Sequence, residues 1–325
     1  MKSRAAPATL RSRGAFLLRA LVSGTLLIVL SRTLDFGAIE SAMALLPWWA
    51  LVSALLILLG QVLLLAWRWH VIASRIGGRL PFGDALRLTF VGLFFSQTLP
   101  TSIGGDAMRI WEARRLGLPG EVALGSVVIE RVTGLAAIAF MVAFAVPFVW
   151  SELGENYLRW ALLALAPAAL ALVVALAFAD SLPLHRLPEK ARAYIRFIAH
   201  ALRRIGGSPR AASDVFLLGM IAAVVGISSA FVIGGQVGIG LGLAAYLVAL
   251  GGSVLLTVLP VSVAGWGVRE MAMVGIFGAM GVPAEKAIVV SLLFGMGVLA
   301  VAMPGGLLWR SVSRGRLPRD KEASE

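Results

Sequence analysis

The segment Leu99–Arg109 reads LPTSIGGDAMR, and the segment Leu259–Arg269, 160 residues later, reads LPVSVAGWGVR. Five of the eleven positions are identical, among them the proline and the arginine. A second pair of similar segments, Gly117–Ala123 and Gly281–Ala287, follows in the same order at an offset of 164. The two proline- and glycine-containing segments interrupt long apolar runs, and we interpret them as the tips of two related repeats.

The composition around these tips is that of a membrane protein. The 325 residues are 59% hydrophobic and only 14% charged, and the mean hydropathy is +0.90. Soluble domains carry about 25% charged and about 45–50% apolar residues. The chain has no cysteine, which excludes disulfides and thiol chemistry. Its three histidines are far apart in sequence, which argues against a histidine metal site.

Apolar runs of the length that a bilayer requires recur along the whole chain. They lie at about 16–30, 45–67, 85–100, 122–149, 160–179, 214–234, 241–259 and 287–309. The first run follows a basic N-terminus, as in a signal peptide. No small-x-small cleavage site comes after it, so we expect an uncleaved first span.

Charge divides the connectors between these runs into two classes. Basic residues dominate the N-terminus, the C-terminus and the connectors 68–87, 109–121 and 180–213. The remaining connectors, 31–44, 150–159 and 235–240, are neutral, acidic or uncharged. Because basic loops stay on the cytoplasmic side, both termini and the basic loop 180–213 are predicted to be cytoplasmic. Topology thus explains the net charge of +12, and nucleic acid is not an expected partner.

This orientation predicts two segments that enter the membrane and return on the same side. The segment 85–108 begins and ends at basic connectors, so it cannot cross an odd number of times. The segment 241–281 begins outside and must return there, because the last span has to end inside. We therefore predict re-entrant hairpins with tips at Leu99–Gly105 and Leu259–Gly267. The alternative is that proline and glycine merely kink packed helices.

The sequence thus predicts an all-α polytopic membrane protein with about six full spans and two oppositely oriented re-entrant hairpins, which form an inverted repeat. Residues 1–325 form a single transmembrane domain, with repeat 1 at about 85–149 and repeat 2 at about 241–309. Within the basic loop, Leu187–Arg204 is either an amphipathic helix on the membrane surface or a solvated loop.

Six charged residues lie at membrane depth near the tips, where a central charge costs about 2.5–3.5 kcal/mol on insertion scales. They are Asp106, Arg109, Glu130, Arg131, Arg269 and Glu270. Neighbouring helical residues point about 100° apart, so we expect neither Glu130 with Arg131 nor Arg269 with Glu270 to neutralise each other. Cross-pairing between the groups, or pairing with a ligand, is expected instead. The network is either purely structural or lines a cavity for a charged head group.

Phosphate is the head group that suits these arginines, because a guanidinium binds it in a bidentate manner. Helices that begin near the tip glycines would add free N–H groups, and the tip serines would add hydroxyls. The predicted substrate-binding residues are Arg109, Arg131, Arg269, Ser102, Ser262, Gly105 and Gly265. Asp106, Glu130 and Glu270 form the predicted charge network, and Pro100 and Pro260 mark the re-entrant tips. We predict no catalytic residue, no metal and no cofactor.

The tips and charges together resemble the flippase-like integral membrane family, which is related to the transmembrane half of bacterial lysylphosphatidylglycerol synthases. The resemblance rests on Pro100, Gly104, Gly105, Asp106, Arg109, Glu130, Arg131, Pro260, Gly265, Gly267, Arg269 and Glu270. It covers nearly the whole chain and implies a protein of the bacterial inner membrane that handles lipids. The synthases carry a soluble aminoacyl-transferase domain after the membrane part. Because this chain ends at Glu325, we expect no such activity and no enzyme.

The sequence leaves three functions open. The leading hypothesis is transbilayer movement, or flipping, of an anionic phospholipid or lipid-linked head group. A membrane-embedded enzyme acting on a lipid phosphate, with Asp106, Glu130 or Glu270 as general base, is the second. The third is an accessory subunit of a lipid-modifying complex. The expected partners are membrane lipids and a lipid-modifying or glycosyl-transfer enzyme. The sequence lacks a G-x-x-x-x-G-K-[ST] motif, so movement would be passive, ion-coupled or driven by downstream consumption.

Overall fold

The computed structural model describes residues 36–44, 46–99, 104–155, 157–184, 187–258 and 265–314. Within these ranges the chain is helical between short connectors and contains no β-strand. The helices are, in chain order, α2 (Phe36–Ala44), α3 (Trp48–Arg75), α4 (Phe82–Thr98), α5 (Gly104–Arg115), α6 (Gly120–Ala145), η1 (Val146–Val149), α7 (Tyr157–Ala177), η2 (Ala179–Ser181), α8 (Glu189–Gly206), α9 (Pro209–Gln236), α10 (Leu243–Thr257), α11 (Val268–Ala279), α12 (Ala284–Ala302) and α13 (Pro304–Arg314).

The long apolar helices confirm a polytopic membrane protein. Among the described residues, five helical segments are long and apolar enough to cross a bilayer. They are Trp48–Arg75, Gly120–Val149, Tyr157–Ala177, Pro209–Gln236 and Ala284–Trp309. These five coincide with five of the six full spans that the sequence predicts. The sixth predicted span, 16–30, lies outside the described residues.

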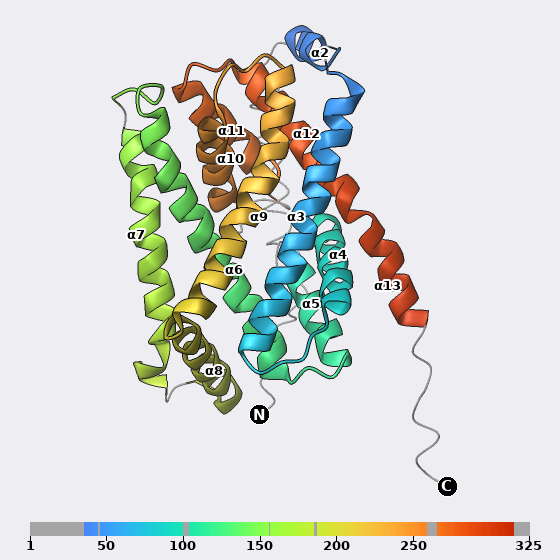
Figure 1. Cartoon of the computed structure of the whole chain (residues 1–325), viewed down its shortest axis with the longest axis vertical. Helices are drawn as coiled ribbons and strands as arrows, with labels where there is room; N and C mark the ends of the chain where they lie inside the picture. Colours follow the sequence, from blue (N-terminus) through green and yellow to red (C-terminus); the bar gives the residue numbers. More distant parts are fainter. Residues whose placement is uncertain are drawn as a thin grey trace, which may run out of the picture.

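Two pairs of short helices occupy opposite ends of the bundle. Helices α4 and α5 pack against each other in its lower half, and α10 and α11 pack against each other in its upper half (Figure 1). The twelve residues of α5 or α11 extend only about 18 Å, which is too short for a bilayer. This placement is the one expected of hairpins that enter from opposite sides, and re-entry into a bilayer stays a prediction.

The segments that join the two members of each pair, 100–103 and 259–264, lie outside the described residues. Four predicted site residues fall there: Pro100, Ser102, Pro260 and Ser262. The repeat boundaries, about 85–149 and 241–309, enclose the two helix pairs and the long helices that follow them. The internal repeat itself also stays a prediction.

The connectors separate as their charges predict. The turns after α3 and α5 and the connector that carries α8 lie at the lower end (Figure 1). The turns after α6, α9 and α11 lie at the upper end. The basic connectors therefore share one end of the molecule, and the assignment of that end to the cytoplasm stays a prediction.

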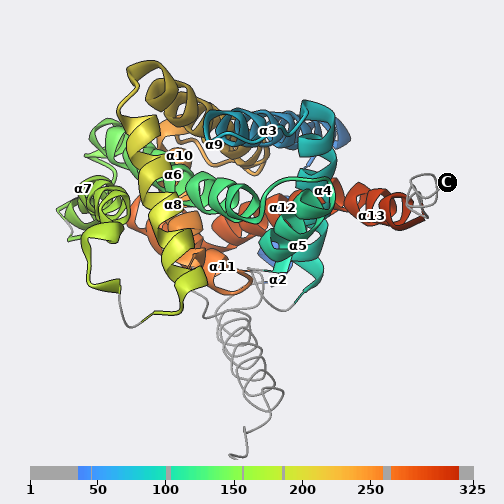
Figure 2. The same ribbon diagram turned by 90° about the horizontal axis from the view of Figure 1, so that it is seen from below.

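Helix α8 resolves the two interpretations of the segment Leu187–Arg204. The segment is helical from Glu189 onward, as the first interpretation predicts, and its contact with a membrane surface stays a prediction. The helix lies across the lower end of the bundle, beneath α6 and α7 (Figure 2). Its apolar side, which includes Ala199, Leu202 and Ile205, is buried against the bundle. Its last turn is held to η2 by Arg203, whose guanidinium donates to both oxygens of Asp180 at 2.7 Å.

The last predicted span, 287–309, consists of two helices. Helix α12 ends at Ala302, and Pro304 begins α13. Proline has no N–H to donate to the carbonyl of residue 300, and its ring would clash with that carbonyl, so an uninterrupted helix is disfavoured here. Beyond the break, α13 packs along α4, with Gly305 close to the backbone of Phe90.

Two apolar cores leave a polar layer between them. The upper core includes Val62 of α3, Met141 of α6 and Ala223 of α9. The lower core includes Trp69, Ile129 and Val215 of the same three helices. Near the level between these cores lie Arg68 of α3 and Glu130 and Arg131 of α6. The two cores thereby position a charged cluster inside the bundle rather than at its ends. We call its members, Arg68, Arg109, Glu130, Arg131 and Asp106, the polar layer.

Candidate functional site

The centre of the polar layer is an ion pair between a short helix and a spanning helix. Nη2 of Arg109 on α5 donates a hydrogen bond to Oε2 of Glu130 on α6. The two side chains are 7% and 9% exposed. Each charge thus compensates the other where an unpaired charge would be strongly destabilising. This pair joins residues 21 positions apart, which is the cross-pairing that the sequence predicts for Glu130.

Arg109 is also held by an aromatic ring. Its guanidinium carbon lies 4.0 Å from the ring centroid of Trp69 on α3. The indole Nε1 of Trp69 donates to Oγ of Ser126 on α6 at 3.0 Å. A chain of contacts therefore runs from α5 through α3 to α6. The buried guanidinium is fixed on several sides, as expected of an arginine that stabilises the bundle.

Arg131 forms the second ion pair of the layer. Its Nε and Nη2 donate to the two oxygens of Asp106 at 2.8 Å each, in the bidentate geometry of a guanidinium–carboxylate pair. The side chain of Asp106 is 15% exposed, but that of Arg131 is 54% exposed. In this conformation Arg131 is therefore the most accessible of the three arginines predicted to bind substrate.

Arg68 is a member of the layer that sequence reasoning missed as a site residue. It is 2% exposed on α3, donates from Nε to the carbonyl of Val215 at 3.1 Å and from Nη2 to Oγ1 of Thr133 at 2.6 Å. A side chain at Gly134 or Gly219 would occupy the space of its guanidinium. In the sequence Arg68 follows an apolar run and begins the basic connector 68–87, which favours a position outside the membrane. Only its position between two tryptophans, inside an amphipathic register, could have indicated burial.

The upper helix pair holds a separate charge cluster. Nε and Nη2 of Arg269 donate to Oε1 of Glu270 at 3.1 and 2.6 Å. Nε also donates to Oγ of Ser291 on α12 at 3.2 Å. Glu270 and Ser291 are fully buried, and the Arg269 side chain is 11% exposed. A Cβ atom at Gly295 would collide with the Arg269 guanidinium, so glycine at that position makes room for it.

The expectation that Arg269 and Glu270 do not neutralise each other is wrong. The reason lies in the start of α11: Gly267 has φ of +87°, and its N–H donates to Oε2 of Glu270 at 2.6 Å. The carboxylate folds back toward the helix N-terminus, as in a capping box. Its other oxygen, Oε1, then points toward the long side chain of Arg269. The two residues can therefore pair although neighbouring helical positions point about 100° apart.

The two tip glycines differ in their surroundings. Gly105 packs so closely on α4 that a Cβ atom would collide with Ser96 and with the backbone of Gly92. Gly265 has φ of +83°, a conformation that L side chains rarely adopt, and lies beside Thr257. At the start of α11 the N–H of Gly267 is occupied by Glu270. The role of Gly105 and Gly265 in binding an anion stays a prediction.

The described contacts thus bring the predicted charge residues into two clusters. The lower cluster contains Asp106, Arg109, Glu130 and Arg131, and the upper one contains Arg269 and Glu270. Within the described ranges no group of three or more His, Asp or Glu side chains is arranged to hold a metal ion. In both clusters an arginine is paired with a carboxylate, and an anion such as phosphate could take the place of that carboxylate.

Comparison of the sequence with known proteins places the chain in a family. A search of the curated proteins found no match to the chain. The family model of the lysylphosphatidylglycerol synthase transmembrane region matches residues 16–306. The match covers the predicted first span, the polar layer and both helix pairs. The chain is therefore an integral membrane protein that belongs to the lysylphosphatidylglycerol synthase transmembrane-region family.

Proposed function

We propose that this protein moves an anionic phospholipid or a lipid-linked head group between the leaflets of the bacterial inner membrane, without covalent chemistry. Family membership supports a role in lipid modification or transport. The two short helix pairs at opposite ends support transport, because paired, interrupted segments are typical of transporter sites near the bilayer midplane.

The observation that carries the proposal is the half-exposed Arg131 within a spanning helix. A charge in the middle of a span is costly, and such residues mark substrate or ion pathways in membrane proteins. The two oxygens of Asp106 accept hydrogen bonds from Nε and Nη2 along one edge of the Arg131 guanidinium. A phosphate offers the same pair of oxygens, so a lipid phosphate can replace the carboxylate without a change in the hydrogen-bonding geometry.

Arg109 and Arg269 have a different position in this proposal. Both side chains are nearly buried, and they form ion pairs with Glu130 and Glu270, respectively. We propose that Arg131 receives the head group first, and that the other two arginines contact it only when their carboxylates release them. The tip serines Ser102 and Ser262 remain the proposed hydroxyl donors.

The proposal includes an orientation and an energy source. The basic end of the bundle, with α8, faces the cytoplasm, as the charges of its connectors favour. Movement is passive, ion-coupled or driven by a partner enzyme that consumes the lipid on the far side. Such a partner acts in lipid modification or glycosyl transfer, and nucleic acid is not one.

Reconstitution in liposomes with fluorescently labelled lipids tests the proposal. We expect the wild type to move an anionic phospholipid, and Arg131→Gln to abolish movement while remaining inserted and folded. Arg131→Lys should restore it poorly, because lysine lacks the planar fork. Arg159→Gln is the control, since Arg159 lies at the start of the spanning helix α7 and stacks on Trp150, 4.4 Å away, outside the polar layer.

The alternatives give other outcomes in the same liposomes. A covalently altered lipid, detected by mass spectrometry, would identify the membrane-embedded enzyme. Lipid movement or modification that requires an added partner would identify the accessory subunit. Normal lipid movement by both Arg131 variants would exclude Arg131 as the head-group site.

A further inference from the structure

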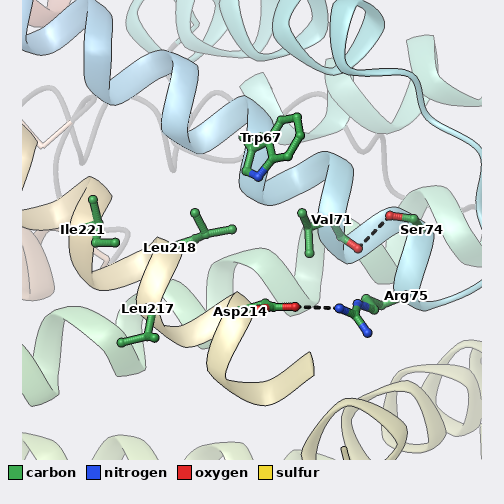
Figure 3. A pocket seen from close by; sticks show the side chains of 8 residues that line it. All are labelled: Trp67, Val71, Ser74, Arg75, Asp214, Leu217, Leu218 and Ile221. Atoms are coloured by element: carbon green, nitrogen blue, oxygen red, sulfur yellow. Dashed lines mark hydrogen bonds and ion pairs between the residues drawn. The ribbon is translucent and has the colours of Figure 1, made fainter. Parts of the chain in front are cut away.

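A groove on the outer face of the bundle runs between α3 and α9. Its volume is about 510 Å³. On α3 it is lined by Trp67, Val71, Ser74 and Arg75, and on α9 by Asp214, Leu217, Leu218 and Ile221 (Figure 3). On each helix these residues recur at spacings of three and four, so they form one stripe on each wall. We call this feature the α3–α9 groove.

The groove changes from polar to apolar along its length. At one end Nη2 of Arg75, the last residue of α3, donates to Oδ2 of Asp214 at 2.6 Å. At the other end lies Ile221, seven residues or about 10 Å further along α9. The polar end faces the basic end of the bundle, where α3 ends and α9 begins. This polarity matches a phospholipid of that leaflet, with its head group at the interface and its chains in the hydrocarbon.

The walls of the groove are exposed in a way that suits a lipid. Leu217 is 53% exposed, Ile221 is 49% exposed and Trp67 is 46% exposed. These side chains belong to spanning helices, so in a bilayer they face acyl chains rather than water. An apolar wall that opens sideways admits a lipid directly from the surrounding leaflet.

The charges at the polar end favour one class of head group. The side chains of Arg75 and Asp214 are 38% and 41% exposed, and together they carry no net charge. Partly exposed pairs of this kind contribute little to folding. A phosphate can accept from the guanidinium while an amine donates to the carboxylate. A zwitterionic head group with both groups complements the pair, whereas a purely anionic one would meet the Asp214 carboxylate.

We propose that the α3–α9 groove binds one phospholipid whose head group carries a phosphate and a primary ammonium. The phosphate lies on Arg75, the ammonium donates to Asp214, and an acyl chain lies along Leu217 and Ile221. A phosphatidylethanolamine has this chemistry. A choline head group lacks N–H donors, so it cannot make the contact with Asp214.

The groove is formed before a lipid arrives. The Trp67 ring is held by His70 and Phe82, with centroid distances of 5.3 and 5.5 Å. Beneath the groove, Nε of Arg68 donates to the carbonyl of Val215 at 3.1 Å and fixes α3 against α9. Little conformational freedom is therefore lost when a lipid binds.

This site is distinct from the polar layer. Trp69 stacks on Arg109 in the layer, and Trp67, two residues earlier, points about 200° away around α3. On α3 the groove thus lies away from Trp69 and Arg109, and Arg68 of the layer separates the two where it bonds the carbonyl of Val215. The inference does not rest on the proposed lipid movement, and it holds for a transporter, an enzyme or an accessory subunit.

Native mass spectrometry of the delipidated, detergent-solubilised full chain tests the proposal. The probes are dioleoyl phosphatidylethanolamine, phosphatidylglycerol and phosphatidylcholine, which differ only in their head groups. We expect the ethanolamine lipid to give the largest fraction of protein that carries one bound lipid in the mass spectrum. Arg75→Gln and Asp214→Asn should each reduce this adduct at least fivefold, and Arg79→Gln, an exposed charge beyond the groove, should leave it unchanged.

A second variant keeps the test decisive if a charge variant does not fold. Leu217→Trp fills the groove, keeps both charges and changes a side chain that already faces the lipid. It should displace the adduct to the same extent. Equal retention of the glycerol or choline lipid, or unchanged adducts in Leu217→Trp, would overturn the proposal. Lipid movement by these variants in liposomes is a separate measurement, so failure of the groove leaves the Arg131 test intact.

Discussion

Arg131 on α6 donates two parallel hydrogen bonds, each of 2.8 Å, to the two oxygens of Asp106 on α5. The pair ties a helix that crosses the bundle to one that is too short to cross. Among the pairs made by Arg109, Arg131 and Arg269 it is the most open, because the Arg131 side chain is 54% exposed and those of Arg109 and Arg269 are 7% and 11% exposed. Displacement of Asp106 by an anion would therefore bind the anion and remove one of the two ion pairs that tie α5 to α6, the other being Arg109–Glu130.

The orientation of the molecule is testable with single cysteines, because the chain has none of its own. Glu155 lies in the upper connector after α6, and Arg196 lies on α8 at the basic end; both are exposed. A membrane-impermeant maleimide added to spheroplasts should label Glu155→Cys and should label Arg196→Cys only after lysis. The reverse pattern would remove the basis for hairpins that enter from opposite sides.

The buried pair Arg109–Glu130 should dominate stability. Removing one partner from a buried ion pair leaves an uncompensated charge and costs about 3–5 kcal/mol. We expect Arg109→Gln and Glu130→Gln each to lower the midpoint of thermal unfolding in detergent substantially. The double variant should be more stable than the sum of the two effects predicts, because no charge is then left alone. Additive losses would show that the two side chains do not depend on each other.

Close packing of the lower helix pair should make Gly105 intolerant of any side chain. A Cβ atom there would collide with Ser96 and with the backbone of Gly92, and backbone cannot yield as a flexible side chain can. We expect Gly105→Ala to destabilise the protein by about 1–3 kcal/mol, the range for overpacking. Gly83→Ala is the control, since a Cβ at Gly83 on the same helix pair meets nothing within 4 Å. The control should be neutral or slightly stabilising, and equal effects would refute the close packing.

The contact that holds α8 should depend on pH. The hydrogen bonds from Arg203 lower the pKa of Asp180 from 3.8 to about 2. A lowered carboxylate pKa means that its stabilising effect is complete above about pH 4 and is lost as the pH falls toward 2. The wild type should therefore exceed Asp180→Asn in free energy of unfolding at neutral pH, and the difference should vanish toward pH 2. Glu189→Gln, at the exposed start of α8, controls for general acid effects, and a pH-independent difference would contradict the prediction.

The spans and the class of protein follow from the sequence. Apolar length is a local property of the chain, so the five spans in the described residues follow from composition alone. The separation of basic from neutral connectors is equally local, and the structure gathers the basic connectors at one end. Except for Arg68, the charged residues of the candidate site could also be selected from the sequence, because a charge beside or within an apolar run is rare and costly.

Which charges meet depends on how the helices pack against one another. Arg109 faces Glu130 because α5 packs against α6 in one particular rotation, which no local pattern encodes. Arg68 is buried because Gly134 and Gly219 on two other helices leave room for it. Arg75 and Asp214 are 139 residues apart, and only the packing of α3 on α9 makes them neighbours. Local patterns fix the helices and the faces they can bury, but the partner of each face depends on long-range packing, which is a property of the whole chain.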